Sequence, residues 1–255
     1  MADGPVPSLI AHRGHASRFP ENTWLALESA LASGVPAIEF DLQLTRDGVP
    51  VVIHDASLER TASLDLDVRA IDFAQARTLS VGEPDRFGPR HGHVPLASLA
   101  ETVERLADWP RATVFVEIKR ESAEVHGVDA TVKRVLDIAR PLGERMVLIS
   151  FVERAVLTAR RLGAPAVGWC LDHYDADERR LADAIAPEHL LVDHRDLPAD
   201  GSAPWPGPWQ WAAWEIVDPD LAVALTARGV DHVETMACAE MLADPRLAPG
   251  RIAAR

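Results

Sequence analysis

The chain has 255 residues, of which 47% are apolar and 25% are charged, a balance that fits a folded globular protein. Its 39 acidic and 26 basic residues give a formal charge of −13, which disfavours nucleic acid and anionic membranes as partners. A negatively charged small molecule would therefore need a local cationic site, and a bound metal ion is one way to supply it.

Short extended segments alternate with helical segments along the chain. The first extended segment covers 8–11 and ends at His12, and a helix is expected from Asn22 or Thr23 to about Ser33, where Gly34 is a stop signal. Later extended segments are expected at 37–42, 51–53, 113–118, 146–150, 166–171, 190–192, 210–213 and 232–234. Later helices are expected at 98–107, 128–139, 153–162, 177–185, 219–227 and 239–242.

This alternation predicts an α/β fold, namely a TIM (β/α)8 barrel that uses residues 1–255 as one domain. Glycines and prolines interrupt the pattern at about 56–94, which we interpret as a small insertion after the second strand, with room for a short helix at 69–79. The connection 193–208 is rich in Pro, Gly and Trp, so the sixth helix of the barrel is expected to be short or absent.

Three features bear on location and partners. Cys170 and Cys238 are the only cysteines, and two buried reduced thiols are the expected state. The N-terminal residues lack the basic start and apolar run of a signal peptide, and no apolar run reaches the length of a spanning helix. We expect a cytoplasmic protein without a stable membrane anchor and without a nucleic-acid partner; its oligomeric state is left open.

Polar side chains gather at the ends of the predicted strands, where TIM barrels carry their active sites. Side chains two apart on a strand share a face, so Glu39 and Asp41 should converge, as should Glu117 and Lys119. The candidate set is His12, Arg13, Glu39, Asp41, His54, Asp55, Glu117 and Lys119. Each of these residues alone has an ordinary structural explanation, such as an ion pair between Glu117 and Lys119, but unpaired charges inside a barrel mouth are costly unless they share a purpose.

The chemistry of this set matches phosphodiester cleavage. The carboxylates of Glu39, Asp41 and Glu117 form an oxygen site for one hard divalent cation, Mg²⁺ or Ca²⁺. With such a cation, Arg13 and Lys119 could neutralise a phosphate. Two histidines, His12 and His54, could then serve as general acid and general base.

The ordered motifs resemble the glycerophosphodiester phosphodiesterase family. The resemblance is carried by His-Arg-Gly at 12–14, Pro-Glu-Asn-Thr at 20–23, the run 39–48, His-Asp at 54–55 and Glu-Ile-Lys at 117–119. It is most specific over 8–61 and 114–119, and Ser-Phe at 150–151 agrees with it.

The resemblance implies a TIM barrel that hydrolyses glycerophosphodiesters to sn-glycerol 3-phosphate and an alcohol, with one divalent cation as cofactor. It implies that His12 and His54 are the acid–base pair, and that the glycerol 2-hydroxyl attacks phosphorus to give a cyclic phosphate that water then opens. By the same resemblance, the metal ligands are Glu39, Asp41 and Glu117, the phosphate contacts are Arg13 and Lys119, and Glu21 and Asn22 lie near the substrate. The insertion is expected to shape the substrate entrance.

The C-terminal part departs from the family pattern, which leaves the substrate open. Val217 stands where the family commonly has Asn, and Met236 stands where it commonly has Asp. Four tryptophans could line an altered pocket or could instead pack a loop against the barrel: Trp205, Trp209, Trp211 and Trp214. The alternatives are a lysophospholipase D-like or other phosphodiesterase, and a catalytically silent barrel that binds a phosphate metabolite.

Overall fold

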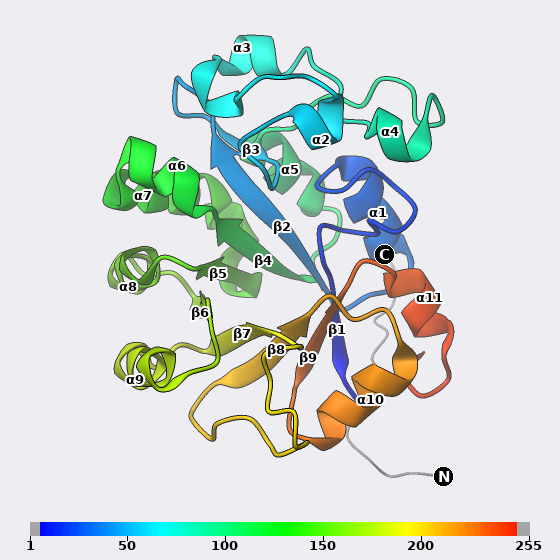
Figure 1. The fold of residues 1–255 in the computed structure, drawn as a ribbon. Coiled ribbons are helices and arrows are strands. Elements are labelled where there is room, and N and C mark those ends of the chain that lie inside the picture. The colour runs from blue at the N-terminus through cyan, green and yellow to red at the C-terminus, as the bar shows by residue number, and fades with distance from the viewer. Residues whose placement is uncertain (1–5, 249–255) are drawn as a thin grey trace.

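The computed structural model describes residues 6–248, and its strands form one sheet that closes on itself (Figure 1). The sheet order is β1-β9-β8-β7-β6-β5-β4-β2-β3, and β1 also pairs with β2. The strands are β1 Ser8–Ala11, β2 Ala37–Leu44, β3 Pro50–Val52, β4 Thr113–Ile118, β5 Met146–Ser150, β6 Ala166–Cys170, β7 His189–Asp193, β8 Gln210–Trp214 and β9 His232–Thr235. All are parallel except β3, which pairs antiparallel with β2 outside the closed ring. The predicted TIM barrel is confirmed.

Helices surround the barrel, as Figure 1 shows. They are α1 Trp24–Ala32, α5 Leu99–Leu106, α6 Arg120–His126, α7 Val128–Ala139, α8 Glu153–Arg161, α9 Ala176–Ile185, α10 Pro219–Ala227 and α11 Cys238–Ala243. A 3-10 helix, Arg140–Arg145, precedes β5. Helix boundaries follow side-chain caps: Thr23 accepts from the Ala26 amide at α1, and Ser98 forms a capping box with Glu101 at α5. The connection between β7 and β8 contains no helix, as predicted.

Helix α6 was not predicted. It has no side-chain cap and holds a mixture of polar and small residues, so its pattern gives little helical signal. Gly127, at φ 83°, separates α6 from α7 because that backbone conformation suits glycine and ends a right-handed helix. Together α6 and α7 fill the crossover between β4 and β5.

The apolar interior has two parts, one between the sheet and the helices and one inside the barrel. The part inside the barrel is narrow. Gly168 on β6 shows how narrow it is, because a Cβ at this position would lie 2.8 Å from the side chains of Ile149 and Leu191. The barrel is therefore a packed core and not a channel. Cys170 and Cys238 are both buried and unpaired, as expected.

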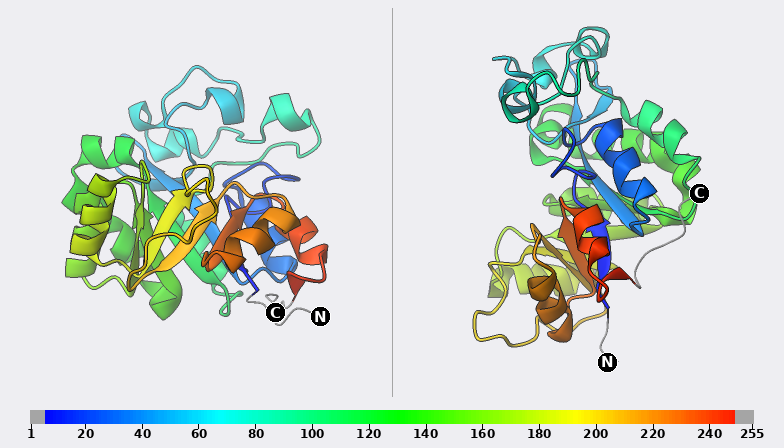
Figure 2. Two further views of the ribbon diagram at one scale, coloured as in Figure 1. Left: turned by 60° about the horizontal axis from the view of Figure 1, so that its bottom comes forward. Right: turned by 90° about the vertical axis from the view of Figure 1, so that its right-hand side faces the viewer.

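The segment between β3 and α5 lies over the end of the barrel toward which β2 points (Figures 1 and 2). It contains α2 Glu59–Ala62, a 3-10 helix at Val68–Ala70, α3 Phe73–Ala76 and α4 Pro84–Phe87. Its apolar cluster is separate from the barrel core and includes Leu58, Val68 and Leu96. This segment holds the predicted insertion. Among residues 6–248, no helix is long and apolar enough to cross a membrane.

Candidate active site

One pocket of about 170 Å³ opens at the C-terminal ends of the strands. Its wall is formed by His12, Arg13, His54, Glu117, Lys119, Ile149, Phe151, Cys170, Leu191, Trp214, Glu215 and Glu234. The chain delivers these groups from the ends of β1, β3, β4, β5, β6, β7, β8 and β9. Segments far apart in the sequence thus meet at one place, as the barrel predicts.

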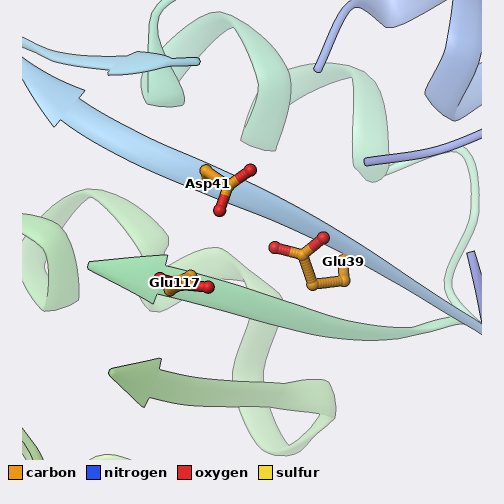
Figure 3. A group of neighbouring side chains, drawn as sticks. All are labelled: Glu39, Asp41 and Glu117. Carbon is orange, nitrogen blue, oxygen red and sulfur yellow. The ribbon is translucent and has the colours of Figure 1, made fainter. Parts of the chain in front are cut away.

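Three carboxylates lie together beside this pocket (Figure 3). Glu39 and Asp41 extend from β2 on the same face, and Glu117 extends from the neighbouring strand β4. One ligand oxygen from each lies within 4.8 Å of the others, and all three residues are buried. Glu39 Oε1 has no hydrogen-bond partner among the described residues. Because all the donors are oxygens, this set fits a hard divalent cation.

The three carboxyl groups differ in their electrostatic surroundings. Burial and the charge of Asp41 raise the pKa of Glu39 well above its usual value, and burial raises the pKa of Glu117. Burial opposes ionisation of Asp41 too, but Lys119 and Arg13 outweigh it and hold the pKa of Asp41 low. The cluster therefore concentrates negative charge that a divalent cation would offset.

The loop after β1 places Arg13 against the carboxylate cluster. Arg13 adopts φ 57°, and its backbone N–H donates to Glu39 Oε2 at 2.9 Å while its Nε lies 3.2 Å from Asp41 Oδ2. Gly14 follows at φ 78°, and a Cβ there would lie 2.6 Å from the backbone of Ala26 in α1. The glycine of the His-Arg-Gly motif is thus required by the close approach of the loop to helix α1.

Lys119 faces the same carboxylates from the other side. Its Nζ lies 2.7 Å from Glu117 Oε1 and 3.4 Å from Asp41 Oδ1, and it also sits 5.8 Å from the centre of the Phe151 ring. Burial alone would lower the pKa of Lys119, but Glu117 and Asp41 raise it, so the ammonium stays charged. Arg13 and Lys119 thus bring two positive charges to the pocket wall.

Glu21 and Asn22 lie behind these residues and are not part of the pocket wall. The Asn22 amide donates to Asp41 Oδ2 at 2.8 Å, and its carbonyl oxygen accepts from the Asp41 backbone N–H at 3.1 Å. Glu21 Oε1 accepts from Arg13 at 3.1 Å and from Arg60 at 2.7 Å. In this structure the two residues orient Asp41 and Arg13; their predicted contact with substrate stays a prediction.

The two histidines occupy different environments. His12 is buried, with Nε2 4.0 Å from Glu39 Oε2, and burial together with Arg13 lowers its pKa to about 3. His54 is more exposed, and its Nδ1 lies 2.6 Å from Asp55 Oδ1. Asp55 in turn accepts from Arg60 Nε at 2.7 Å. Both rings reach the pocket, one uncharged and one held by a carboxylate.

Sequence reasoning missed Glu234 and Arg60. Glu234 is 3% exposed on β9 and lines the pocket, and its pKa is raised to about 8 by burial and by Glu117 and Asp41. The signal was its spacing, because Glu234 lies two residues after His232 on a strand and so points inward. Arg60 bridges Glu21 and Asp55, a contact that joins the insertion to the loop after β1 and that sequence spacing does not reveal.

The tryptophans divide between the two predicted roles. Trp214 lines the pocket and meets Phe151 edge-on, with ring centroids 5.8 Å apart. Trp205 stacks on Tyr174 at 3.8 Å, and Trp211 packs against both of these rings. Trp209 continues this cluster through Trp211, so loop packing accounts for three of the four.

The two departures from the family pattern lie outside the pocket wall. Val217 is 61% exposed after β8. Met236 follows β9, and its backbone carbonyl accepts from the Ser17 N–H at 2.9 Å. Neither substitution removes a group from the carboxylate and histidine set.

Comparison with known proteins places this geometry in a family. Residues 12–231 match the sequence profile of the glycerophosphoryl diester phosphodiesterase family. A probable glycerophosphodiester phosphodiesterase 1 of Mycobacterium tuberculosis is 35% identical over 165 residues, which cover 61% of this chain and 60% of that protein. A mouse lysophospholipase D is 30% identical over 153 residues, which cover 60% of this chain and 44% of that protein. These matches thus span less than two thirds of either relative.

A solved structure has the same fold. The Oleispira antarctica phosphodiesterase in complex with the product sn-glycerol-3-phosphate superposes with a TM-score of 0.81 at 22% identity, over 93% of this chain and 96% of that one. The extent of the profile match, together with the ordered motifs and the barrel that unites them, shows that the chain belongs to the glycerophosphoryl diester phosphodiesterase family.

Proposed function

We propose that the protein is a divalent-metal-dependent phosphodiesterase that hydrolyses glycerophosphodiesters to sn-glycerol 3-phosphate and an alcohol. One observation carries the proposal: three buried carboxylates, two histidines and two cationic side chains from separate strands meet at one pocket. Family membership supports the same chemistry. A relative of the same fold is described in complex with sn-glycerol-3-phosphate, which agrees with the proposed product.

The donor set defines the cofactor that we propose. Glu39, Asp41 and Glu117 would hold one Mg²⁺ or Ca²⁺, and the unpartnered Glu39 Oε1 supports this assignment. When bound, the cation supplies neutralisation of the phosphate charge. Arg13 and Lys119 line the pocket and add positive charge that orients the phosphate.

The two histidines would move the protons. An uncharged His12 can accept the proton of the attacking hydroxyl, which we take to be the glycerol 2-hydroxyl. Asp55 accepts the Nδ1–H of His54 and stabilises the doubly protonated ring, whose Nε2–H passes its proton to the leaving alkoxide. Water then opens the cyclic phosphate, with the two roles reversed.

The active-site pocket has a volume of about 170 Å³, and a second hollow of about 180 Å³ shares Glu117, Lys119 and Phe151 with it. The first volume suits a glycerol phosphate moiety. The second leaves room for the alcohol group, so the pocket volume alone does not decide between a small alcohol and a lysophospholipid. The expected cytoplasmic location stays a prediction.

A titration of Mg²⁺ or Ca²⁺ during hydrolysis of glycerophosphocholine tests the proposal. Release of sn-glycerol 3-phosphate should rise with the cation and saturate, and EDTA should abolish it. Hydrolysis that is indifferent to EDTA would remove the metal assignment. Metal binding without turnover of any diester would favour the silent barrel, and turnover of lysophosphatidylcholine alone would favour the lysophospholipase D alternative.

A further inference from the structure

Glu234 carries a buried carboxyl group that has no role in the proposed mechanism. It lies on β9 opposite Ile10 of β1, is 3% exposed, and belongs to the wall of the active-site pocket. Its Oε1 has no hydrogen-bond partner among residues 6–248. Because an unsatisfied buried carboxyl is costly, this atom calls for a partner that enters the pocket.

The neighbouring charged groups do not provide that partner. Glu234 lies outside the tight carboxylate set, whose ligand oxygens are within 4.8 Å of one another. Arg13 is paired with Glu21 and Asp41, and Lys119 is paired with Glu117 and Asp41. No described basic side chain forms an ion pair with Glu234, so its carboxyl is free to hydrogen-bond to a ligand in the pocket.

The surroundings of Glu234 indicate the chemistry of that ligand. Ile149, Cys170 and Leu191 give the inner wall an apolar surface that suits a short carbon skeleton. A phosphate would be repelled by a carboxylate, but a hydroxyl group can donate a hydrogen bond to it, and can both donate to and accept from an uncharged carboxyl. The apolar surface beside the free Glu234 carboxyl is therefore suited to a short carbon chain that carries a hydroxyl group.

We propose that Glu234 is a specificity-determining residue that recognises a free hydroxyl on the glycerol side of the substrate. This inference rests on the proposed function and assigns a role to a residue outside the acid–base pair and the metal ligands. In this arrangement Arg13 and Lys119 contact the phosphate, and Glu234 forms a hydrogen bond with a hydroxyl of the glycerol group. A diester that keeps the attacking 2-hydroxyl but lacks the terminal hydroxyl would leave the carboxyl unsatisfied and bind less well.

Two substrates separate recognition from chemistry. Glycerophosphocholine offers both free glycerol hydroxyls, whereas 2-hydroxypropyl p-nitrophenyl phosphate keeps the attacking 2-hydroxyl and lacks the terminal one. Glu234→Leu should lower kcat/KM for glycerophosphocholine by about 10–100-fold, because a buried substrate hydroxyl is left without its hydrogen-bond partner. Hydrolysis of 2-hydroxypropyl p-nitrophenyl phosphate by the same variant should stay close to that of the native enzyme. Glu234→Gln, which keeps a hydrogen-bonding side chain, should retain most of the activity on glycerophosphocholine.

Mn²⁺ affinity, measured by calorimetry on the same variants, excludes an effect through the cation. The Mn²⁺ affinity should be unchanged in Glu234→Leu. Glu178→Leu on α9, outside the pocket wall, is the control for loss of a carboxylate elsewhere in the fold. Equal losses on both substrates, with weaker Mn²⁺ binding, would overturn the inference and make Glu234 a metal contact. Unchanged kcat/KM on glycerophosphocholine would also overturn it. If the native protein did not hydrolyse glycerophosphocholine, that result would contradict the proposed function itself, independently of the Glu234 variants.

Discussion

The two ends of the barrel interior both bury polar side chains, but they do so in opposite ways. At the C-terminal end, Glu39, Asp41 and Glu117 crowd together among ionised partners. At the N-terminal end, where the strands begin, His189 and His232 lie 5.4 Å apart and pack against the Phe115 ring. Nδ1 of each of these histidines also lacks a hydrogen-bond partner among the described residues.

The difference lies in charge. Burial lowers the pKa of His189 to about 4 and lowers that of His232, so both rings are uncharged at neutral pH and pack as aromatic groups. In the carboxylate cluster, Lys119 and Arg13 instead hold Asp41 ionised beside Glu39 and Glu117, whose pKa values are raised. A buried polar atom without a partner therefore does not mark a site by itself; several titratable groups with strongly shifted pKa values converging on a pocket do.

The largest expected effect compares histidines at the two ends. His12→Ala and His54→Ala should each lower kcat on glycerophosphocholine by roughly 10²–10⁴-fold, the usual scale of general acid–base catalysis. His189→Gln, at the opposite end of the barrel, should leave kcat unchanged. Steady-state kinetics of the three purified variants measure this directly. An active His54→Ala enzyme would remove His54 from the mechanism, and an inactive His189→Gln enzyme of normal stability would break the comparison.

A smaller loss of activity is expected when a metal ligand is replaced, and this replacement should also raise the stability of the metal-free protein. Glu39→Gln should lower activity by about 10²–10³-fold and weaken Mg²⁺ binding, because the cation loses one charged ligand. The pKa of Glu39 is higher in the folded than in the unfolded state. At a pH above the unfolded-state pKa, the unfolded chain therefore ionises Glu39 more readily than the folded chain does, and this lowers the stability of the metal-free fold. The metal-free variant should therefore melt a few degrees higher than the native protein. Calorimetry with and without Mg²⁺ checks both parts, and a lower Tm without metal would contradict the electrostatic argument.

The smallest effect concerns acid stability at the N-terminal end. The folded-state pKa of His189 lies below its unfolded value of about 6.5, so between about pH 6.5 and 4 the unfolded chain binds more protons and stability falls as pH falls. Lowering the pH from 7 to 5 should cost about 1–2 kcal/mol through this residue. His189→Gln should lose less stability over the same interval. Urea unfolding at the two pH values measures the difference, and identical pH slopes for both proteins would contradict it.

The sequence predicted the barrel and the central site because their signals are local. Strand and helix bounds differ by a few residues at most from those predicted, since alternation and caps act over short distances. The convergence of Glu39 and Asp41 followed from strand periodicity, and that of Glu117 followed from the barrel, whose strands end at one rim; the structure adds that β2 and β4 pair directly. The roles of four other residues could not be predicted from the sequence, because they depend on side-chain contacts between distant parts of the fold. These residues are Glu21, Asn22, Arg60 and Glu234.

The attachment of the insertion has a consequence for how substrate enters. Arg60 joins the insertion to Glu21 and Asp55, the Glu83 carboxylate accepts from the Glu21 backbone N–H, and Arg86 donates to the Ala16 carbonyl. A hinged cover would have to break all of these bonds at every turnover. These contacts instead fix the insertion to the loop after β1 and to the barrel rim, so substrate enters past a rigid segment. Residues 64–82 are held in the same way, because Arg46 pairs with Asp72 and Arg77 pairs with Glu101. A change of substrate range should therefore come from side chains of the pocket wall and not from movement of the insertion.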